Sequence, residues 1–434
     1  MFIKHLYLFL NKKIQLIVNH KTQKIHIIGA GVSGLIAATV LENNGYHPII
    51  LESTDRIGGR VKTDCIQNFN LDHGFQVLLT SYLFAQKYLD YKSLELEEFL
   101  PGAILFKNKK KITIGDPLRN LSFLFPTLLA PIGSVSDKFK ILKLTNRLKR
   151  KKNSEIFSEP EFTTLEYLKK NGFSNQIIDD FFRPFFGGIY LEDELSTSSR
   201  MFEFVYKMFS KGKAAIPNNG IAAIPNQLKS KLKNTQFNFN TIVETVKTNE
   251  IILQDSSTIK SDFTIITSGA SSLISNLSGS SIKWKSCQTL YFLTPERIIR
   301  KNLIGLSSIS NSLINNIHYS KKIDQISEAE KYLLSVTVIK KHHLSDLVLI
   351  ESVKKELIEI FGIYKTKFLK LYNIKKALPD LNKIQYEMQP SETQILPGIY
   401  LAGDEQLNGS LNAAMISGER AALAIIESIT NIKR

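Results

Sequence analysis

The stretch "KIHIIGAGVSGLIAATVLENNGYHPIILESTDRIGGR", residues 24–60, decides the fold. It opens with a short β-branched run, residues 24–28, which is typical of a buried parallel strand. Gly29, Gly31 and Gly34 follow with the spacing G-x-G-x-x-G. In this pattern the first glycine permits a tight turn, the second lets the backbone approach a pyrophosphate, and the third lets a helix pack against the strand.

The elements after the glycines complete a dinucleotide-binding unit. A helix is predicted from about Val32 to Asn44, and Gly45 is a natural helix stop. The free N–H groups at the start of this helix would face phosphates. A second strand ends in Glu52, 18 residues past Gly34, close to the ~20 residues at which the acid that binds a ribose hydroxyl is expected. A carboxylate there argues against NADP, because it would repel a 2′-phosphate.

The end of the stretch distinguishes a flavin from a nicotinamide. Glu52, Arg56, Gly58, Gly59 and Arg60 form the pattern E-x-x-x-R-x-G-G-R. The second glycine pair makes another close backbone approach to the cofactor, and Arg60 can neutralise the pyrophosphate, with Arg56 nearby. A second clamp of this kind suits a cofactor that stays bound.

This pattern resembles the FAD-binding signature of the amine oxidase superfamily, which includes monoamine and polyamine oxidases, protoporphyrinogen oxidase, phytoene desaturases and carotenoid isomerases. A second segment supports the resemblance: "GIYLAGDEQLNGSLNAAMISGERAALAIIESI", residues 398–429. It reads as a strand ending at Gly403 and Asp404, followed by a long helix rich in small residues. In the family this segment closes over the flavin, with the acidic residue near the ribityl chain and pyrophosphate.

Weaker matches lie between the two ends. "LDHGFQVL", residues 71–78, resembles the strand and turn that pass the isoalloxazine ring, with Gly74 leaving room. "IPNNGIAAIPNQL", residues 216–228, resembles a family loop that leads into a helix. Residues 241–250 and 261–270 resemble the strands that flank the adenine, where the backbone of Val243 would meet the base.

The resemblance implies a mixed α/β fold, with a Rossmann-like FAD-binding domain and an inserted substrate domain (glutathione-reductase-2-like). An N-terminal extension would span 1–23, the FAD-binding domain 24–90, 215–275 and 385–434, and the substrate domain 91–214 and 276–384. The implied FAD-binding residues are Gly29, Gly31, Ser33, Gly34, Glu52, Arg56, Gly58, Gly59, Arg60, Gly74, Phe75, Val243, Gly403 and Asp404.

The sequence also departs from the family. Many amine oxidases carry a lysine, bound through water to flavin N5, on a substrate-domain strand, but the comparable strand "KSCQTLYFL" offers no lysine that can be placed there. Some relatives attach the flavin to a C-terminal cysteine, whereas Cys65 and Cys287 both lie before residue 288, so non-covalent FAD is expected. Neither cysteine has metal-type spacing, no metal is expected, and a reducing, cytoplasmic location fits.

An apolar, proline-interrupted stretch, Leu121 to Val135, precedes eight basic residues within 138–152. Two interpretations compete for the segment 121–152. It could be a peripheral membrane patch at the mouth of a lipophilic channel. Alternatively, it could be a buried loop followed by an ordinary solvated helix. The net charge of +16 is explained either by such a surface or by lysines scattered through the chain, and no motif indicates nucleic acid.

A second run, "FFRPFFGGIYLED", residues 181–193, packs five aromatic residues around one arginine. It could line an apolar pocket or form ordinary core. Arg183 needs an anion or a dipole to face. Substrate contacts are expected from Gln76, Arg183, Phe186 and Tyr190.

The function expected is that of an FAD-dependent oxidoreductase that removes hydride from a CH–CH or CH–NH bond of an apolar or mixed substrate. No catalytic residue is assigned, since the flavin would carry the chemistry. An isoprenoid-like or porphyrinogen-like substrate is favoured, with oxygen or a quinone as acceptor. The alternatives are a flavin-dependent carotenoid-type isomerase without net redox change and a non-catalytic flavoprotein.

Overall fold

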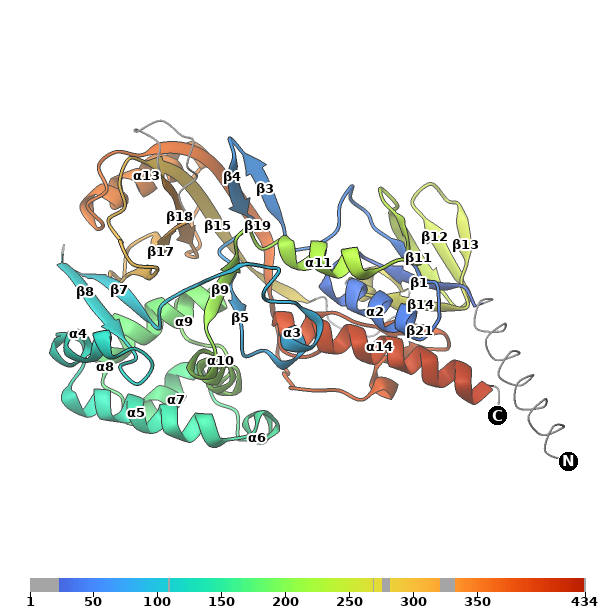
Figure 1. Ribbon diagram of the computed structural model, residues 1–434, viewed down its shortest axis with the longest axis horizontal. Coiled ribbons are helices and arrows are strands. Elements are labelled where there is room, and N and C mark those ends of the chain that lie inside the picture. Colours follow the sequence, from blue (N-terminus) through green and yellow to red (C-terminus); the bar gives the residue numbers. More distant parts are fainter. Residues whose placement is uncertain (1–22, 108–109, 268, 275–281, 321–331, 433–434) are drawn as a thin grey trace, which may run out of the picture.

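The computed structural model describes residues 23–107, 110–267, 269–274, 282–320 and 332–432. These residues form two lobes side by side (Figure 1). One lobe holds a parallel sheet with α2, α11 and α14, and the other holds a large, mainly antiparallel sheet with helices α4 to α10 and α13. Within the described residues, no helix combines the length and the apolar character needed to cross a membrane.

The first lobe is built on a six-stranded sheet with the order β10–β2–β1–β14–β21–β20. All neighbouring pairs are parallel except β20–β21. The central strands β1 and β14 are buried along their whole length, as expected for a parallel sheet covered on both faces. The bounds are β1 Ile25–Ile28, β2 Ile49–Leu51, β10 Gln236–Asn238, β14 Phe263–Ile266, β20 Gln394–Leu396 and β21 Ile399–Leu401.

The strands of this sheet come from three separated parts of the chain, 25–51, 236–266 and 394–401. A smaller antiparallel sheet packs on one face through an apolar cluster that joins Ile28, Val246 and Ile266. Its strands are β11 Val243–Lys247, β12 Glu250–Leu253 and β13 Thr258–Lys260. The exact domain boundaries given above stay a prediction.

Helix α2 (Val32–Asn43) packs against the glycine loop at Gly34 and against α14 (Leu411–Ile432) at Gly418. A Cβ added at Gly34 would lie 2.1 Å from the Gly29 carbonyl oxygen, and one at Gly418 would lie 2.2 Å from the Ser33 carbonyl oxygen. The predicted helix after the first strand is confirmed, ending at Asn43 with Gly45 in the left-handed region. This close packing brings the two ends of the chain together at the start of α2.

The second lobe is built on a seven-stranded sheet with the order β19–β15–β18–β17–β16–β7–β8. One face packs against α13 in an apolar core that includes Leu290, Val336 and Val353. The bounds are β7 Gly102–Lys107, β8 Lys110–Gly115, β15 Lys283–Thr294, β16 Ile304–Ser307, β17 Ile314–Tyr319, β18 Tyr332–Val338, β19 Lys367–Asp380 and α13 Asp346–Glu359.

Helices within residues 124–211 cover the other side of the second lobe. They are α4 Leu124–Leu129, α5 Val135–Arg150, α6 Asn153–Ser158, α7 Thr164–Lys170, α8 Asn175–Ile177, α9 Arg183–Tyr190 and α10 Ser199–Lys211, with a π-helical segment at Ile178–Phe182. Helix α11 of the first lobe spans Ala223–Lys231. The other elements are β3 Thr63–Ile66, β4 Phe69–Asp72, β5 Leu78–Leu79, α3 Leu83–Tyr88, β6 Leu96–Glu98 and β9 Ala214–Pro217.

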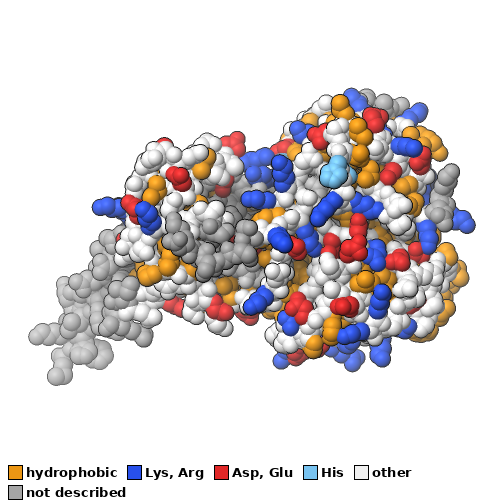
Figure 2. Space-filling view, turned by 180° about the vertical axis from the view of Figure 1, so that it is seen from behind, with side chains coloured by type: hydrophobic (Ala, Val, Ile, Leu, Met, Phe, Trp, Pro, Cys, Tyr) orange, Lys and Arg blue, Asp and Glu red, His pale blue; other side chains and the backbone are white. Residues whose placement is uncertain are grey.

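Lysine and arginine side chains are spread over both lobes on the face that Figure 2 shows, with acidic side chains among them. They form no continuous basic stripe on that face. The basic side chains of that face are therefore dispersed rather than gathered into a groove.

Candidate functional site

A cavity of about 1990 Å³ runs between the two lobes. It begins at the glycine loop before α2 and continues to helices α5, α9 and α10 of the second lobe. Its volume is roughly twice the upper end of about 1,000 Å³ for an ordinary ligand pocket. The cavity therefore has room for a large cofactor and a substrate together.

The glycine loop forms one end of the cavity. Gly29 donates its N–H to the Leu51 carbonyl oxygen at 2.8 Å, and Gly58 donates to the Ala30 carbonyl oxygen at 2.9 Å. A Cβ added at Gly31 would meet no heavy atom nearer than 4.0 Å and would occupy cavity space. This arrangement fits a pyrophosphate that approaches the bare backbone at Gly31.

Glu52 is buried beside this loop and lines the cavity. Its carboxylate accepts hydrogen bonds from the N–H of Ala30 at 2.8 Å and from the hydroxyl of Thr54 at 2.7 Å. These contacts hold the acid at the end of β2, where the ribose of a dinucleotide is expected. Ser33, at the start of α2, and Val243, at the start of β11, also line the cavity.

Arg60 connects the two ends of the chain at the cavity wall. Its guanidinium forms an ion pair with the buried Asp404 and lies 5.0 Å from the ring centre of Trp284. Burial, with a further contribution from the Asp404 carboxylate, raises the pKa of the neighbouring Glu405 to about 8. One Glu405 carboxyl oxygen is buried without a hydrogen-bond partner among the described residues. Gly59, Arg60, Asp404 and Glu405 all line the cavity.

Four residues expected at the site lie outside the cavity lining. Arg56 forms an ion pair with Asp64 at 2.7 Å, because β3 passes closer to it than the glycine loop does. Gly34 packs against Gly29, and Gly403 donates its N–H to the Ser417 hydroxyl at 2.9 Å. Arg183 meets the Asp179 carboxylate at 3.0 Å and the Asp193 carbonyl oxygen, so the anion and dipole it needs are local. The expected substrate contact from Arg183 stays a prediction, although the described structure places this residue outside the cavity lining.

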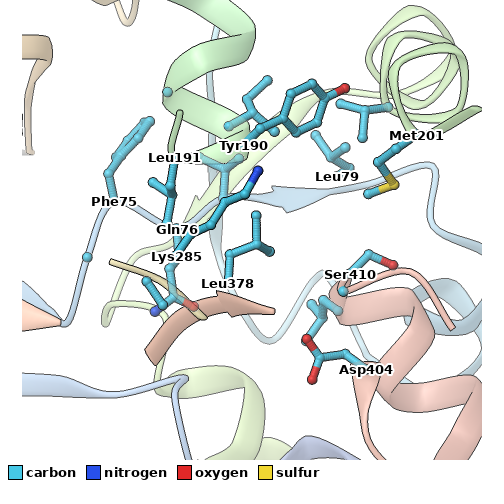
Figure 3. A pocket seen from close by; sticks show the side chains of 18 of the residues that line it. Phe75, Gln76, Leu79, Tyr190, Leu191, Met201, Lys285, Leu378, Asp404 and Ser410 are labelled. Carbon is cyan, nitrogen blue, oxygen red and sulfur yellow. The ribbon is translucent and has the colours of Figure 1, made fainter. Parts of the chain in front are cut away.

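The remaining candidates lie at the middle of the cavity. Gly74, Phe75 and Gln76 line it after β4, and the Gln76 amide donates to the Arg60 carbonyl oxygen at 2.9 Å. Phe186 and Tyr190 line it from α9. The Tyr190 hydroxyl is buried without a hydrogen-bond partner among the described residues, and burial raises its pKa well above the usual value. Figure 3 shows Tyr190, Gln76 and Phe75 around the same space.

Lys285 is the residue that sequence reasoning missed. It lies on β15, lines the cavity, and appears beside Gln76 and Leu378 in Figure 3. Its ammonium lies 3.4 Å from the Glu192 carboxylate and donates to the Thr197 hydroxyl at 3.1 Å. The expectation that this strand offers no placeable lysine was wrong. Lys283 and Lys285 lie on the same side of a strand by alternation, so only the packing distinguishes the exposed one from the cavity one.

Apolar side chains dominate the far part of the cavity. The aromatic run 181–193 divides between the two roles considered for it: Phe181, Phe185 and Phe186 line the cavity, whereas Phe182 is fully buried core. The other apolar lining residues of this part include Ile141, Leu142, Phe162, Ile189, Met201, Val205 and Phe209.

A family model described as flavin containing amine oxidoreductase matches residues 32–426. The chain belongs to this family. The expected superfamily and its flavin cofactor, FAD, are thereby confirmed. The glycine loop, Glu52 and Arg60 are the described residues that fit such a cofactor.

Two curated members of the flavin amine oxidoreductase group illustrate the range of similarity. An L-amino-acid oxidase from Sistrurus catenatus edwardsii is 28% identical over 158 residues, 35% of this chain and 31% of that protein. Protoporphyrinogen oxidase 2, chloroplastic/mitochondrial, from Arabidopsis thaliana is 26% identical over 179 residues, 41% of this chain and 34% of that protein. The chain thus spans about a third of the length of the curated relatives it matches.

Solved structures of similar shape cover almost the whole chain. An oxidoreductase from Methanosarcina mazei has a TM-score of 0.69 at 17% identity, covering 93% of this chain and 100% of that chain. Cyclohexylamine oxidase from Brevibacterium oxydans has a TM-score of 0.67 at 14% identity, covering 94% and 99%. These likenesses concern the fold, and the predicted fold class is confirmed.

Proposed function

We propose that this flavin amine oxidoreductase family member is an FAD-dependent oxidoreductase. It oxidises a CH–CH or CH–NH bond of a largely apolar substrate, with oxygen or a quinone as the electron acceptor. The observation that carries the proposal is the single cavity that joins the glycine loop to the aromatic wall of α9 and α10. When bound, the flavin supplies the two-electron oxidation.

The residues at the glycine end would hold the cofactor without a covalent bond. Gly31 and Gly59 leave backbone exposed to a pyrophosphate, Glu52 stands at the ribose position, and Arg60 supplies positive charge. Val243 stands at the adenine position. Gly74 and Phe75 would lie beside the ring system, since they line the cavity between the glycine loop and the apolar wall.

The arginines of the cavity favour a substrate without a carboxylate to recognise. Arg60 and Arg119 are the two arginines among the described lining residues. Arg60 is paired with Asp404, and Arg119 donates to the carbonyl oxygens of Phe209 and Gly212 at 2.6 Å each. Neither arginine can pair with a substrate α-carboxylate unless its present contacts break. The aromatic wall instead favours a porphyrinogen-like or isoprenoid-like body from a lipophilic pool at a membrane.

Lys285 would orient the reacting part of the substrate or a water molecule. It stands between Gln76 and Leu378 at the centre of the cavity, held by Glu192 and Thr197. The resemblance to amine oxidases, many of which carry a lysine on this strand, supports this role. Tyr190, whose hydroxyl has no partner among the described residues, would donate to a polar atom of the substrate.

The proposal is tested by anaerobic mixing of the purified protein with candidate substrates. Reduced tetrapyrroles, unsaturated isoprenoids, hydrophobic amines and L-amino acids are added separately, and the flavin absorbance is followed. Stable bleaching by one of the first three classes supports the proposal. Bleaching by L-amino acids alone contradicts the proposed substrate class, and product formation without bleaching would indicate the isomerase alternative.

A further inference from the structure

Exposed apolar side chains concentrate on one short part of the chain. Sixteen large apolar side chains are exposed in the described residues, and eight of them fall within 118–139. Helix α4 has no buried residue at all. We call this set the α4 patch: Leu118, Leu121, Leu124, Phe125, Leu128, Leu129, Val135 and Phe139.

The α4 patch decides between the two interpretations of the segment 121–152. A buried loop would hide Leu121, Phe125 and Leu129, but these side chains are 79%, 70% and 77% exposed. Exposed apolar side chains that lie together on a surface mark a partner or a membrane rather than an ordinary solvated face. The exposed apolar side chains of this segment therefore indicate that another surface covers them in the cell.

The charges of residues 118–152 indicate what kind of surface the α4 patch would bind. Between residues 118 and 152 the only acidic residue is Asp137, which is buried and accepts hydrogen bonds from Ser134 and Ser174. Residues 135, 139, 143, 147 and 150 follow one another along the outer face of α5 at helical spacing, from Val135 and Phe139 to three basic residues. An apolar wedge that continues into a basic face, with no exposed acid among its own residues 118–152, is complementary to an anionic lipid surface.

Not every basic residue of this segment is available. Arg147 and Lys151 both form ion pairs with Glu203. Lys143 and Arg150 are exposed and form no ion pair with any residue that the structure describes. These two are exposed cations of α5 that can meet lipid headgroups.

A second group of exposed apolar side chains lies around α13 and serves as a comparison. Leu347 is 77% exposed, the same value as Leu129. Charges of both signs are mixed around it: Asp346 and Glu351 lie beside it in the sequence, and Glu351 pairs with Lys354 at 2.8 Å, so α13 lacks a purely basic face. None of this group lines the cavity, whereas the α4 patch does contribute to it.

The α4 patch adjoins the substrate cavity. Leu124 and Leu128 are exposed on the surface and also line the cavity, together with Thr127 and Lys138. We propose that the α4 patch is a docking surface for an anionic lipid bilayer and that α4 forms the portal through which a lipophilic substrate passes from the bilayer into the cavity. The portal rests on the proposed function, but the docking surface does not.

Vesicle sedimentation of the flavin-loaded protein tests the docking. The wild type and three variants are mixed with phosphatidylcholine vesicles, with or without phosphatidylglycerol. Phe125 and Leu129 do not line the cavity, so F125S/L129S should keep its flavin but lose about tenfold or more in partitioning, since two large apolar side chains no longer enter the bilayer. K143E/R150E should lose the preference for phosphatidylglycerol. L347S, the matched control, should sediment like the wild type.

Any of the following three outcomes would contradict the proposed docking surface. The wild type could fail to sediment with phosphatidylglycerol vesicles, or L347S could lose as much binding as F125S/L129S. Light scattering could instead show a dimer that F125S/L129S dissociates, with vesicle binding absent, which would make a second copy the occupant. Because flavin absorbance and substrate bleaching are measured separately in detergent, a failure of docking is distinguishable from a failure of the proposed function.

Discussion

Arg60 and Asp404, 344 residues apart in the chain, form an ion pair at the wall of the cavity. Arg60 follows the first βαβ unit, and Asp404 follows the last strand of the same sheet. The pair therefore joins the two most specific sequence segments at one point of the site.

Removing Arg60 should destabilise the flavin-free protein. R60M leaves the buried Asp404 carboxylate without its cation, and we expect a loss of about 2 kcal/mol in the free energy of unfolding. This loss is smaller than for a fully buried ion pair, because the Arg60 side chain is 38% exposed. R60M/D404N should regain most of this loss. Urea unfolding of the two variants measures the difference, and equal destabilisation in both would contradict an energetic coupling between them.

Gly31→Ala should impair flavin binding, whereas Gly34→Ala should destabilise the fold. The Gly31 methyl would enter open cavity, so G31A should fold normally but lose flavin at least tenfold, about 1.4 kcal/mol of binding free energy. The Gly34 methyl would lie 2.1 Å from the Gly29 carbonyl oxygen, so G34A should be destabilised with or without flavin. Flavin content and thermal unfolding separate the two effects. Full flavin content in G31A would refute the placement of the pyrophosphate.

Lys285→Met should slow flavin reduction by substrate without loss of flavin. If Lys285 positions a proton or a water molecule, the expected effect is about 10²-fold on the reduction rate. Lys283→Met is the matched control, because Lys283 lies on the same strand but is exposed. Stopped-flow reduction of both variants measures the effect. Similar rates in K285M and K283M would remove Lys285 from the reaction.

Asp72 should make folding stability depend on pH in an unusual direction. Burial raises the pKa of Asp72 to about 6, although Thr63 and Ile221 donate hydrogen bonds to its carboxylate. The folded state therefore holds the proton more tightly than the unfolded state, so this contribution is present at low pH and is lost as the pH rises from about 4 through 6. By linkage the change is about 3 kcal/mol.

Asp72→Asn should abolish that dependence. The difference in the free energy of unfolding between wild type and D72N is measured by urea unfolding at several pH values, with the exposed Asp55→Asn as control. The wild type should lose stability relative to D72N as the pH rises. A constant difference from pH 4 to 7 would show that Asp72 ionises normally in the folded protein.

The two ends of the chain were predictable because their chemistry is local in sequence. The turn at Gly29, the helix from Val32 and the acid at Glu52 follow from spacing alone. The partner of Arg56 was not predictable, because the approach of Asp64 depends on how β3 packs. Arg183 is neutralised locally by Asp179, four residues earlier, and this pairing was not considered in the sequence analysis.

The positions of Lys285 and of the α4 patch relative to the cavity could not be predicted from the sequence either. Strand alternation places Lys283 and Lys285 on the same side of β15. Only the position of Glu192, in the loop after α9, shows which of the two lysines lines the cavity. For residues 121–135, an apolar run is compatible with burial or with exposure. Only the exposure of the apolar side chains of α4 in the folded structure distinguishes the two.

The visible absorption spectrum of the purified protein tests the central claim most directly, followed by identification of the molecule released on heating. We expect a flavin spectrum and release of FAD without proteolysis, since no covalent attachment is expected. A colourless protein that also fails to take up added FAD would contradict the cofactor site built from Gly31, Glu52 and Arg60.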